Sequence, residues 1–291
     1  LLVDPTRWQP LRLVDANGVT YVQTYLTPHW GRVRPFAIQN PAWYRPSFFP
    51  RAPQAAELSD ILAKSAQLTD TTKALVDFWA ANPGTVSPPG QWIQIAEQVS
   101  INDRNTLDRD VKLFFGTGQA LLDASIAAWD TKLAYDSVRP ITAIRYYFRN
   151  QTVLAWGGPG KGAQYILGQN WHPYQRTTSP TPPFPEFVSG HSTFSAAAAF
   201  VIGGIRASDG ITLTGTVKAR AIGVEGNTTP VNDVTFTWTS LPQAADSAGI
   251  SRIWGGIHFT RANENGGQLG RSVGGTVLAR VRALFEGRNV F

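Results

Sequence analysis

The stretch KLAYDSVRP occupies residues 132–140 and places two cationic side chains, Lys132 and Arg139, next to a proline. Before it, apolar residues repeat at three- and four-residue spacing at Leu122, Ile126 and Trp129, which predicts a buried helix face leading to Lys132. Seven residues separate the two cations, so on one continuous helix they would lie on nearly the same face. An isolated pair of this kind is usually solvated, but an arginine on a buried face needs an anion.

A second segment, Ser189-Gly190-His191, lies where a Pro-rich stretch gives way to an Ala-rich helix. The backbone N–H groups of a helix's first turn are free to bind an anion. Glycine lets a ligand approach the backbone closely, and the serine hydroxyl adds a donor. The alternative is a plain helix cap, in which Ser189 or Ser192 satisfies the first turn.

A third segment runs from Ser251-Arg252 to His258 and is interrupted by two glycines. A lone histidine of this kind is usually a hydrogen-bonded core residue. The chain has only four histidines, however, and two of them, His191 and His258, belong to these segments. The other two, His29 and His172, lie in aromatic loops and are assigned to structure.

Together the three segments supply three fixed cations, a small hydroxyl, a glycine amide and two imidazoles. This set matches what is needed to bind a tetrahedral oxyanion such as phosphate or its structural mimic, vanadate. The sequence therefore predicts that side chains far apart in the chain meet around one anion pocket.

Composition narrows the classes of function. The 291 residues carry 26 basic and 20 acidic side chains, a net charge of +6, but the basic residues are scattered rather than clustered. That distribution argues against nucleic-acid binding and favours attraction of small anions. The absence of cysteine excludes disulfides and thiolate metal sites. No apolar run reaches the ~18 residues of a membrane span.

Methionine is also absent, and the chain begins at Leu1. We therefore expect a processed or trimmed chain. Its localisation is expected to be periplasmic or extracellular, with the export signal absent from the sequence.

Patterning predicts a mainly α-helical bundle. Residues 1–57 are rich in Pro, Trp and Phe and are expected to form an N-terminal wrap with one strand in 19–25, while 58–291 form a helical catalytic domain. A Pro-rich lip is expected at 179–185 and a short β-hairpin insertion at 211–239. The expected helices are 55–79, 90–99, 107–135, a stretch after Pro140, 194–205, one beginning at Leu241, and 262–285.

The three segments resemble the bacterial vanadium-dependent haloperoxidases, of the type 2 phosphatidic acid phosphatase and haloperoxidase superfamily. The family pattern is Lys-x6-Arg-Pro, Pro-Ser-Gly-His and Ser-Arg-x5-His-x3-Asp. Two positions depart from it: Val188 replaces the proline, and Ala262 replaces the aspartate that would orient the histidine. Asn263 or Glu264 is a candidate substitute for that aspartate. At Asn82 the resemblance implies an aspartate paired with Arg252.

The likeness extends to flanking stretches and covers most of the chain. These stretches are residues 30–36, 88–92, 182–195 and 256–259. Trp129 and Phe184 fall where such enzymes carry aromatic residues near the halide site. Family members usually begin with a further helical segment, which suggests that this chain is the C-terminal part of a longer protein.

The resemblance implies a role for each residue of the pocket. Nε2 of His258 would bind vanadate, and His191 would act as general base. Lys132 would polarise the activated oxidant. The vanadate oxygens would be held by Lys132, Arg139, Arg252, Ser189 and Gly190. The implied partners are hydrogen peroxide, bromide or chloride, which is oxidised to hypohalous acid, and a small organic acceptor. A homo-oligomer is compatible with the sequence.

Two alternatives use the same pocket. One is a phosphomonoesterase in which His258 forms a phosphohistidine and His191 protonates the leaving alkoxide. The other is a non-catalytic anion-binding module, favoured by the missing aspartate. The motifs do not separate the first alternative from the haloperoxidase, because vanadate resembles the pentacovalent state of phosphoryl transfer.

Overall fold

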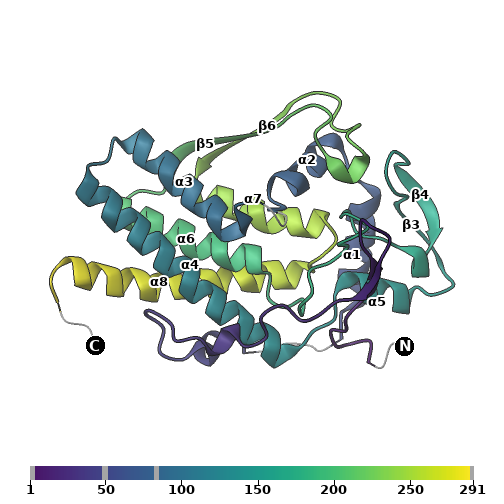
Figure 1. Cartoon of the computed structure of the whole chain (residues 1–291), viewed down its shortest axis with the longest axis horizontal. Coiled ribbons are helices and arrows are strands. Elements are labelled where there is room, and N and C mark those ends of the chain that lie inside the picture. Colours follow the sequence, from purple (N-terminus) through teal and green to yellow (C-terminus); the bar gives the residue numbers. More distant parts are fainter. Residues whose placement is uncertain (1–3, 48–51, 82–84, 289–291) are drawn as a thin grey trace.

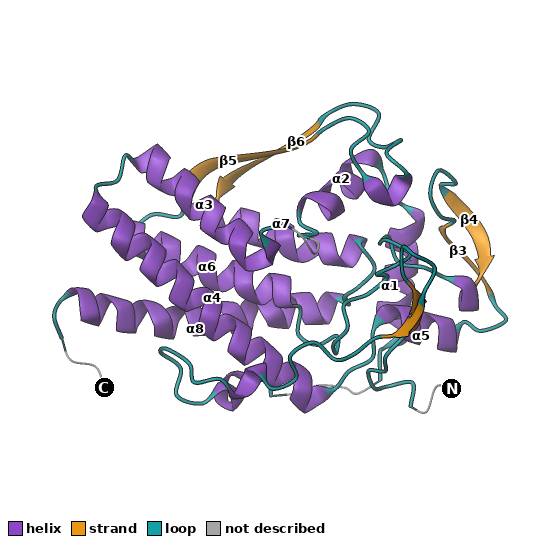
Figure 2. Cartoon of the chain, in the orientation of Figure 1, coloured by secondary structure: helices purple, strands orange, loops and turns teal. Residues whose placement is uncertain are grey.

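The computed structural model describes residues 4–47, 52–81 and 85–288. Helices dominate the fold, and three small antiparallel hairpins lie at its periphery (Figures 1 and 2). The helices are α1 (Ala55–Ala66), α2 (Asp70–Phe78), α3 (Ser87–Asp103), α4 (Leu107–Tyr135), α5 (Pro140–Tyr147), α6 (Gly190–Arg206), α7 (Leu241–Trp254) and α8 (Thr260–Phe285). The prediction of a mainly helical bundle with a hairpin insertion is confirmed.

The strands form three two-stranded sheets. They are β1 (Arg12–Val14) with β2 (Thr20–Val22), β3 (Thr152–Trp156) with β4 (Ala163–Leu167), and β5 (Gly210–Val217) with β6 (Val234–Ser240). The last pair is the predicted insertion, and its alternating burial reflects one face packed on the helices. The β3–β4 hairpin was not predicted.

The helical pattern of residues 55–79 is divided between two helices. Thr69 begins α2 as its N-cap, and Thr69 and Thr72 exchange side-chain and backbone hydrogen bonds in a reciprocal capping arrangement. The apolar stripe continues across the break, which is why periodicity alone suggested a single helix.

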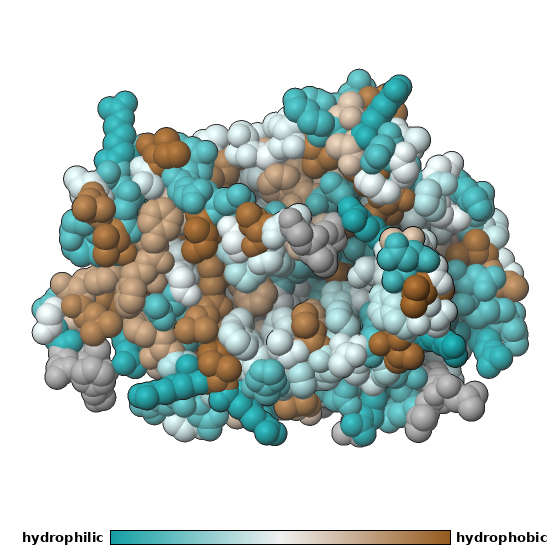
Figure 3. Space-filling view, viewed as in Figure 1, coloured by the Kyte–Doolittle hydropathy of each residue, from teal (hydrophilic) through white to brown (hydrophobic). Residues whose placement is uncertain are grey.

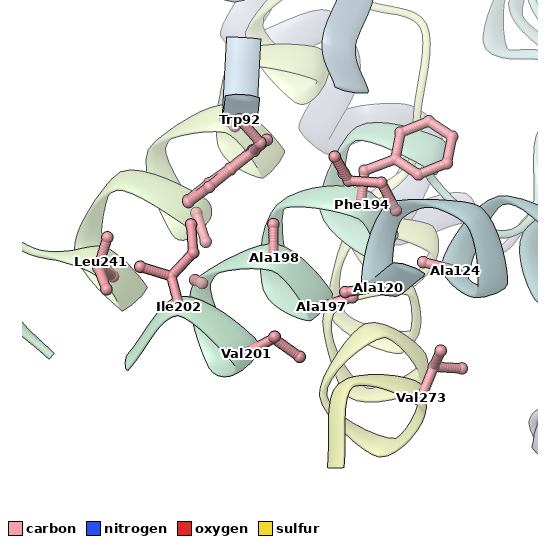
Figure 4. Close-up of a cluster of buried hydrophobic side chains, with 14 of the residues drawn as sticks. Trp92, Ala120, Ala124, Phe194, Ala197, Ala198, Val201, Ile202, Leu241 and Val273 are labelled. Atoms are coloured by element: carbon pink, nitrogen blue, oxygen red, sulfur yellow. The ribbon is translucent and has the colours of Figure 1, made fainter. Parts of the chain in front are cut away.

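The centre of the bundle is α6, which packs between α3, α4, α7 and α8. Its alanines lie against alanines of α4 and aliphatic residues of α7 and α8 (Figure 4). Labelled neighbours in this core include Trp92, Ala120, Ala124, Ala197, Ala198, Leu241 and Val273. Small side chains on α6 allow close helix approach, so the start of α6 at Gly190 is held in a fixed place.

Three glycines of α8 make the contact with α6 especially close. Gly266, Gly270 and Gly274 recur every four residues and face the backbone of α6. A Cβ on Gly266 would lie 2.8 Å from the carbonyl oxygen of Ser189, and one on Gly270 would overlap the carbonyl of Thr193. The glycine stripe therefore fixes the position of Ser189 along α8.

The N-terminal segment lies against α4 and is attached to it by carboxylates. Asp123 of α4 is fully buried and accepts backbone N–H bonds from Phe36, Ala37 and Ile38 at 2.6, 2.7 and 3.0 Å. Asp130 receives a bidentate pair from Arg45. Charge-assisted bonds of this kind are among the stronger hydrogen bonds. The division into a wrap at 1–57 and a domain at 58–291 stays a prediction.

Apolar side chains gather on the surface over the end of the bundle formed by α3, α4 and α8 (Figure 3). Exposed members include Ile101, Leu107, Val111, Phe115 and Leu284. Patches of this kind are typical of contact surfaces. Among the helices in the described part of the chain, none combines the length and apolarity needed to cross a bilayer.

The glycine stripe yields a stability prediction. We expect Gly270→Ala to lower the free energy of unfolding by about 1–3 kcal/mol, because the added methyl forces α6 and α8 apart. The control is Gly118→Ala on α4, where an added Cβ meets no described atom within 4 Å. That change should raise stability by about 0.5–1 kcal/mol through helix propensity. Urea unfolding measures both; equal effects of the two variants would contradict the packing assigned to Gly270.

Candidate active site

Lys132 and Arg139 converge, but not because they share a helix face. Helix α4 ends at Tyr135, Asp136 adopts a left-handed conformation (φ 46°), and Arg139 is the N-cap of α5. The expectation of one continuous helix through both cations is therefore wrong. Asp136 tolerates this conformation better than most residues, and the turn directs both cations at the same Pro-rich lip.

Lys132 is fully buried under the lip, which in the structure continues from the Pro-rich run through residues 186–188 to the start of α6. Its ammonium donates to the carbonyl oxygens of Pro185 (2.9 Å), Glu186 (3.0 Å) and Val188. Burial lowers the pKa of Lys132 well below its ordinary value, and the charge of Arg139 acts in the same direction while Glu186 opposes it. In this structure the ammonium thus organises the lip.

Arg139 has one donor to spare. Its Nε donates to Phe184 O at 2.9 Å and its Nη1 to Ile257 O at 2.8 Å, and Nη1 lies 3.2 Å from Nε2 of His258. Nη2 is buried and finds no hydrogen-bond partner within residues 4–47, 52–81 and 85–288. Burial lowers the pKa of Arg139 to about 10, against the opposing charge of Glu186. A buried guanidinium donor of this kind can donate to the oxygen of an anion.

His258 is bound on its other side by a carboxylate. Nδ1 lies 2.9 Å from Oε1 of Glu186, and both side chains are at most 3% exposed. Burial lowers the pKa of His258 well below its ordinary value, and Arg139 and Lys132 reinforce this effect. The ring is therefore neutral, and the contact is a hydrogen bond to a carboxylate rather than an ion pair.

The expectation that Asn263 or Glu264 replaces the missing aspartate is wrong. Asn263 accepts from the Ser192 hydroxyl at 2.7 Å, and Glu264 is exposed on α8. The carboxylate comes instead from Glu186, four residues before Gly190. One signal in the sequence could have found it: Glu186 is the single charged residue within a run of prolines and aromatics leading into the second motif.

Ser189 serves as the N-cap of α6 and can still donate to an anion. Its Oγ accepts from the backbone N–H of Ser192 at 3.3 Å and from the Ser192 hydroxyl at 2.8 Å. A hydroxyl has two acceptor positions and one hydrogen, so capping leaves Ser189 a donor. Ser189 can therefore cap α6 and donate to an anion at the same time. Gly190, the first residue of α6, adds one of the free N–H groups of the first turn.

The end of α2 faces the other half of the pocket. His191 Nε2 lies 2.8 Å from Trp79 O, and Arg252 Nη2 donates to Val76 O at 2.5 Å. Carbonyls at a helix C-terminus lack intrahelical partners and carry partial negative charge, so they suit these two groups. Burial lowers the pKa of Arg252 to about 9, against the charge of Asp77. Asn82, expected at the position of a carboxylate partner of Arg252, lies outside the described residues.

Aromatic rings border the cationic side of the pocket. The centroid of Phe184 lies 5.1 Å from Lys132 Nζ and 5.1 Å from the guanidinium carbon of Arg139. Trp129 and Phe184 are in contact, with ring centroids 4.9 Å apart. The structure therefore brings both halide-site candidates to the two cations, and their role toward halide stays a prediction.

The electrostatic balance of the pocket is positive. Lys132, Arg139 and Arg252 are each at most 1% exposed, and the buried carboxylate of Glu186 faces Lys132 and Arg139. Burial raises the pKa of Glu186 to about 7, although Arg139 and Lys132 oppose the rise. Several buried cations around one carboxylate favour a further anion. The arrangement can bind an oxyanion, offer it an unprotonated imidazole nitrogen, and move a proton through His191.

Comparison with known proteins places this chain in a family. The model of the VCPO (vanadium chloroperoxidase) second helical-bundle domain matches residues 112–287, and the chain belongs to that family. No curated protein matches it in sequence.

The chain resembles several solved structures, each at 25% identity. Against a holo-type bacterial vanadium-dependent chloroperoxidase the TM-score is 0.84, covering 97% of this chain and 62% of the other. Against the apo-type enzyme the TM-score is 0.86, and the match covers 97% of this chain and 64% of the other. Against the first bacterial vanadium-dependent iodoperoxidase the TM-score is 0.72, with 96% of this chain and 62% of the other covered. The chain therefore spans less than two thirds of these relatives.

Acid should destabilise the anion-free protein through its buried imidazoles. Burial lowers the pKa of His191 well below its ordinary value, and Arg252 adds to this effect. The unfolded chain therefore binds a proton near pH ~6.5 that the folded chain excludes, so stability is present above that pH and is lost as pH falls. The free energy of unfolding should therefore fall less steeply with pH in His191→Gln than in the wild type. The difference in slope should be about 1.4 kcal/mol per pH unit between about pH 6 and 5. Urea unfolding at several pH values measures it.

The control for that experiment is His29→Gln, at an exposed position. It should leave the slope as in the wild type. A His191→Gln slope identical to the wild type would contradict the neutral state assigned to His191.

Proposed function

We propose that this chain is a vanadate-dependent haloperoxidase, which uses hydrogen peroxide to oxidise bromide or chloride to hypohalous acid. The observation that carries the proposal is the pairing of two groups at one point. Nη2 of Arg139 is a buried donor without a partner in the described part of the chain, and Nε2 of His258 lies beside the same guanidinium. An anion that also accepts a nitrogen ligand fits both, and vanadate is such an anion.

The remaining donors fit the same group. Nε2 of His258 would bind the metal centre, while Arg139 and Arg252 neutralise its oxygens with charge that persists at any working pH. Ser189 and the Gly190 N–H would donate from the start of α6. Lys132 would exchange one of its three lip carbonyls for an anion oxygen. When bound, vanadate supplies a Lewis-acidic centre at which hydrogen peroxide is activated.

His191 would move the proton. Its Nε2 faces the carbonyl of Trp79, which can only accept, so Nε2 carries the hydrogen and Nδ1 is the basic nitrogen. Because burial and Arg252 lower its pKa, His191 is neutral and able to accept a proton from incoming peroxide at neutral pH. Trp129 and Phe184 would border the path of the halide.

The second candidate is a phosphomonoesterase. Nε2 of His258, with Nδ1 bound by a carboxylate, is also suited to attack phosphorus, the alkoxide leaving with a proton from His191 and water later hydrolysing the phosphohistidine. That role requires a protonated His191, which its lowered pKa disfavours in the anion-free protein. A non-catalytic anion-binding module needs neither histidine in a defined state. Export from the cell and homo-oligomer formation remain predictions from sequence.

The deciding experiment compares two reactions. Halogenation of monochlorodimedone is followed with vanadate, hydrogen peroxide and bromide or chloride, and hydrolysis of p-nitrophenyl phosphate is followed with the vanadate-free protein. We expect the first reaction to proceed. Turnover of the phosphate ester alone would make the phosphatase the function, and turnover of neither would leave the binding module.

His258→Ala should abolish vanadate binding, because it removes the nitrogen ligand. Isothermal titration with orthovanadate, without peroxide or halide, measures the affinity. His29→Ala is the matched control and should bind as the wild type does. Unchanged affinity in His258→Ala would defeat the assignment of the ligand.

Arg139→Lys tests the unpartnered donor. Lysine keeps the charge but not the planar fork that spans Phe184 O, Ile257 O and the pocket. We expect vanadate affinity to fall by about tenfold or more, the value of one charge-assisted bond. Arg109→Lys, at an exposed position of α4, is the control. Equal affinities of the two variants would contradict the role given to Nη2.

A further inference from the structure

One buried carboxylate is given no role in the haloperoxidase mechanism above. Glu186 is 1% exposed and lies in the lip, between the Pro-rich run and the start of α6. We propose that Glu186 is the positioning residue of this site: it fixes the tautomer and the orientation of His258, so that Nε2 presents a lone pair to the bound anion. The inference rests on the proposed function only for the identity of that anion.

The tautomer follows from the chemistry of the contact. Oε1 of Glu186 already accepts the N–H of Phe259 and lies 2.9 Å from Nδ1 of His258, so as an acceptor it places the ring hydrogen on Nδ1. Nε2 of the neutral ring is then unprotonated. The N–H of Arg139 Nη1, 3.2 Å away, points to the same state, because it needs an acceptor there. A histidine that binds a metal centre through Nε2 requires this tautomer.

The orientation is fixed by the same oxygen atom. Oε1 of Glu186 also accepts the backbone N–H of Phe259 at 3.0 Å. One carboxylate oxygen therefore holds both the ring of His258 and the peptide that follows it. Rotation of the ring would break the first bond, and movement of the chain after α7 would break the second.

Glu186 is itself held by the first motif. Its backbone N–H donates to Ser137 O at 3.1 Å, and the next N–H, of Phe187, donates to Ser137 Oγ at 2.8 Å. Its carbonyl accepts from Lys132 at 3.0 Å. Residues 132–140 thus fix the carboxylate, and the carboxylate fixes His258. Glu186, which precedes the Ser189-Gly190-His191 segment, therefore connects residues 132–140 to His258.

Ala262 occupies the position at which the family pattern has an aspartate, and there is no room for a carboxylate there. Ala262 is fully buried, and its carbonyl accepts the N–H of Ser189 at 3.0 Å. The first turn of α8 therefore packs against the start of α6, and the carboxylate approaches His258 from the lip instead. The same geometry would serve vanadate ligation or nucleophilic attack.

The first test reads the tautomer in the vanadate-free protein. The chain has four histidines, so ¹H–¹⁵N correlation of the imidazole rings resolves each one, and His258→Ala assigns its signals. We expect the wild-type His258 to carry its hydrogen on Nδ1. Glu186→Ala should lose this preference, and Glu186→Gln, which keeps an oxygen acceptor, should restore most of it.

The second test reads affinity for orthovanadate, without peroxide or halide. Glu186→Ala should bind about 10–100-fold more weakly, as is typical when the hydrogen-bond partner of a ligating histidine is removed. Glu186→Gln should fall between that variant and the wild type. Glu264→Gln, at an exposed glutamate of α8, is the control and should bind as the wild type does.

A wild-type His258 protonated on Nε2 would overturn the inference, and that result does not depend on whether any variant folds. Wild-type affinity in Glu186→Ala would also overturn it. If the wild type shows the Nδ1–H tautomer, lost in Glu186→Ala, but binds no vanadate, the positioning role stands and the proposed function fails.

Discussion

The burial of three cations, Lys132, Arg139 and Arg252, in one site is the constraint on which the rest of that site depends. A buried charge costs several kcal/mol unless it is paired and hydrogen-bonded. Here each cation receives backbone carbonyls: three for Lys132, two for Arg139 and one for Arg252. These bonds satisfy donors without neutralising the charge. The site therefore stays positive, which favours an anion beside these cations.

The fold meets this constraint by bringing the ends of helices together. Helix α4 ends beside Lys132, α5 begins at Arg139, α6 begins at Ser189, and α2 and α7 end near Arg252. Helix ends offer unpaired N–H and C=O groups, so they can surround charged side chains without extra polar residues. The glycine stripe on α8 and the carboxylates of α4 hold these ends in place. A rigid scaffold therefore carries a site assembled almost wholly from termini and one lip.

Much of this could be predicted from the sequence, because apolar periodicity and chemical motifs are local. The long helix α4, the helix start at Gly190 and the hairpin at 210–240 follow from patterns within single segments. The errors have two causes. The Lys132–Arg139 turn depends on a left-handed Asp136 and the break before α2 on the Thr69 cap, which are local backbone features that apolar periodicity does not report. The partner of His258 depends on a contact 72 residues away in sequence, which is set by geometry between segments.

The most direct measurement of the central claim is the location of vanadium in crystals soaked with orthovanadate, by its anomalous scattering. The account predicts one strong site at bonding distance from Nε2 of His258, with the guanidinium groups of Arg139 and Arg252 around its oxygens. A vanadium site elsewhere on the molecule, or none in crystals saturated with orthovanadate, would contradict it.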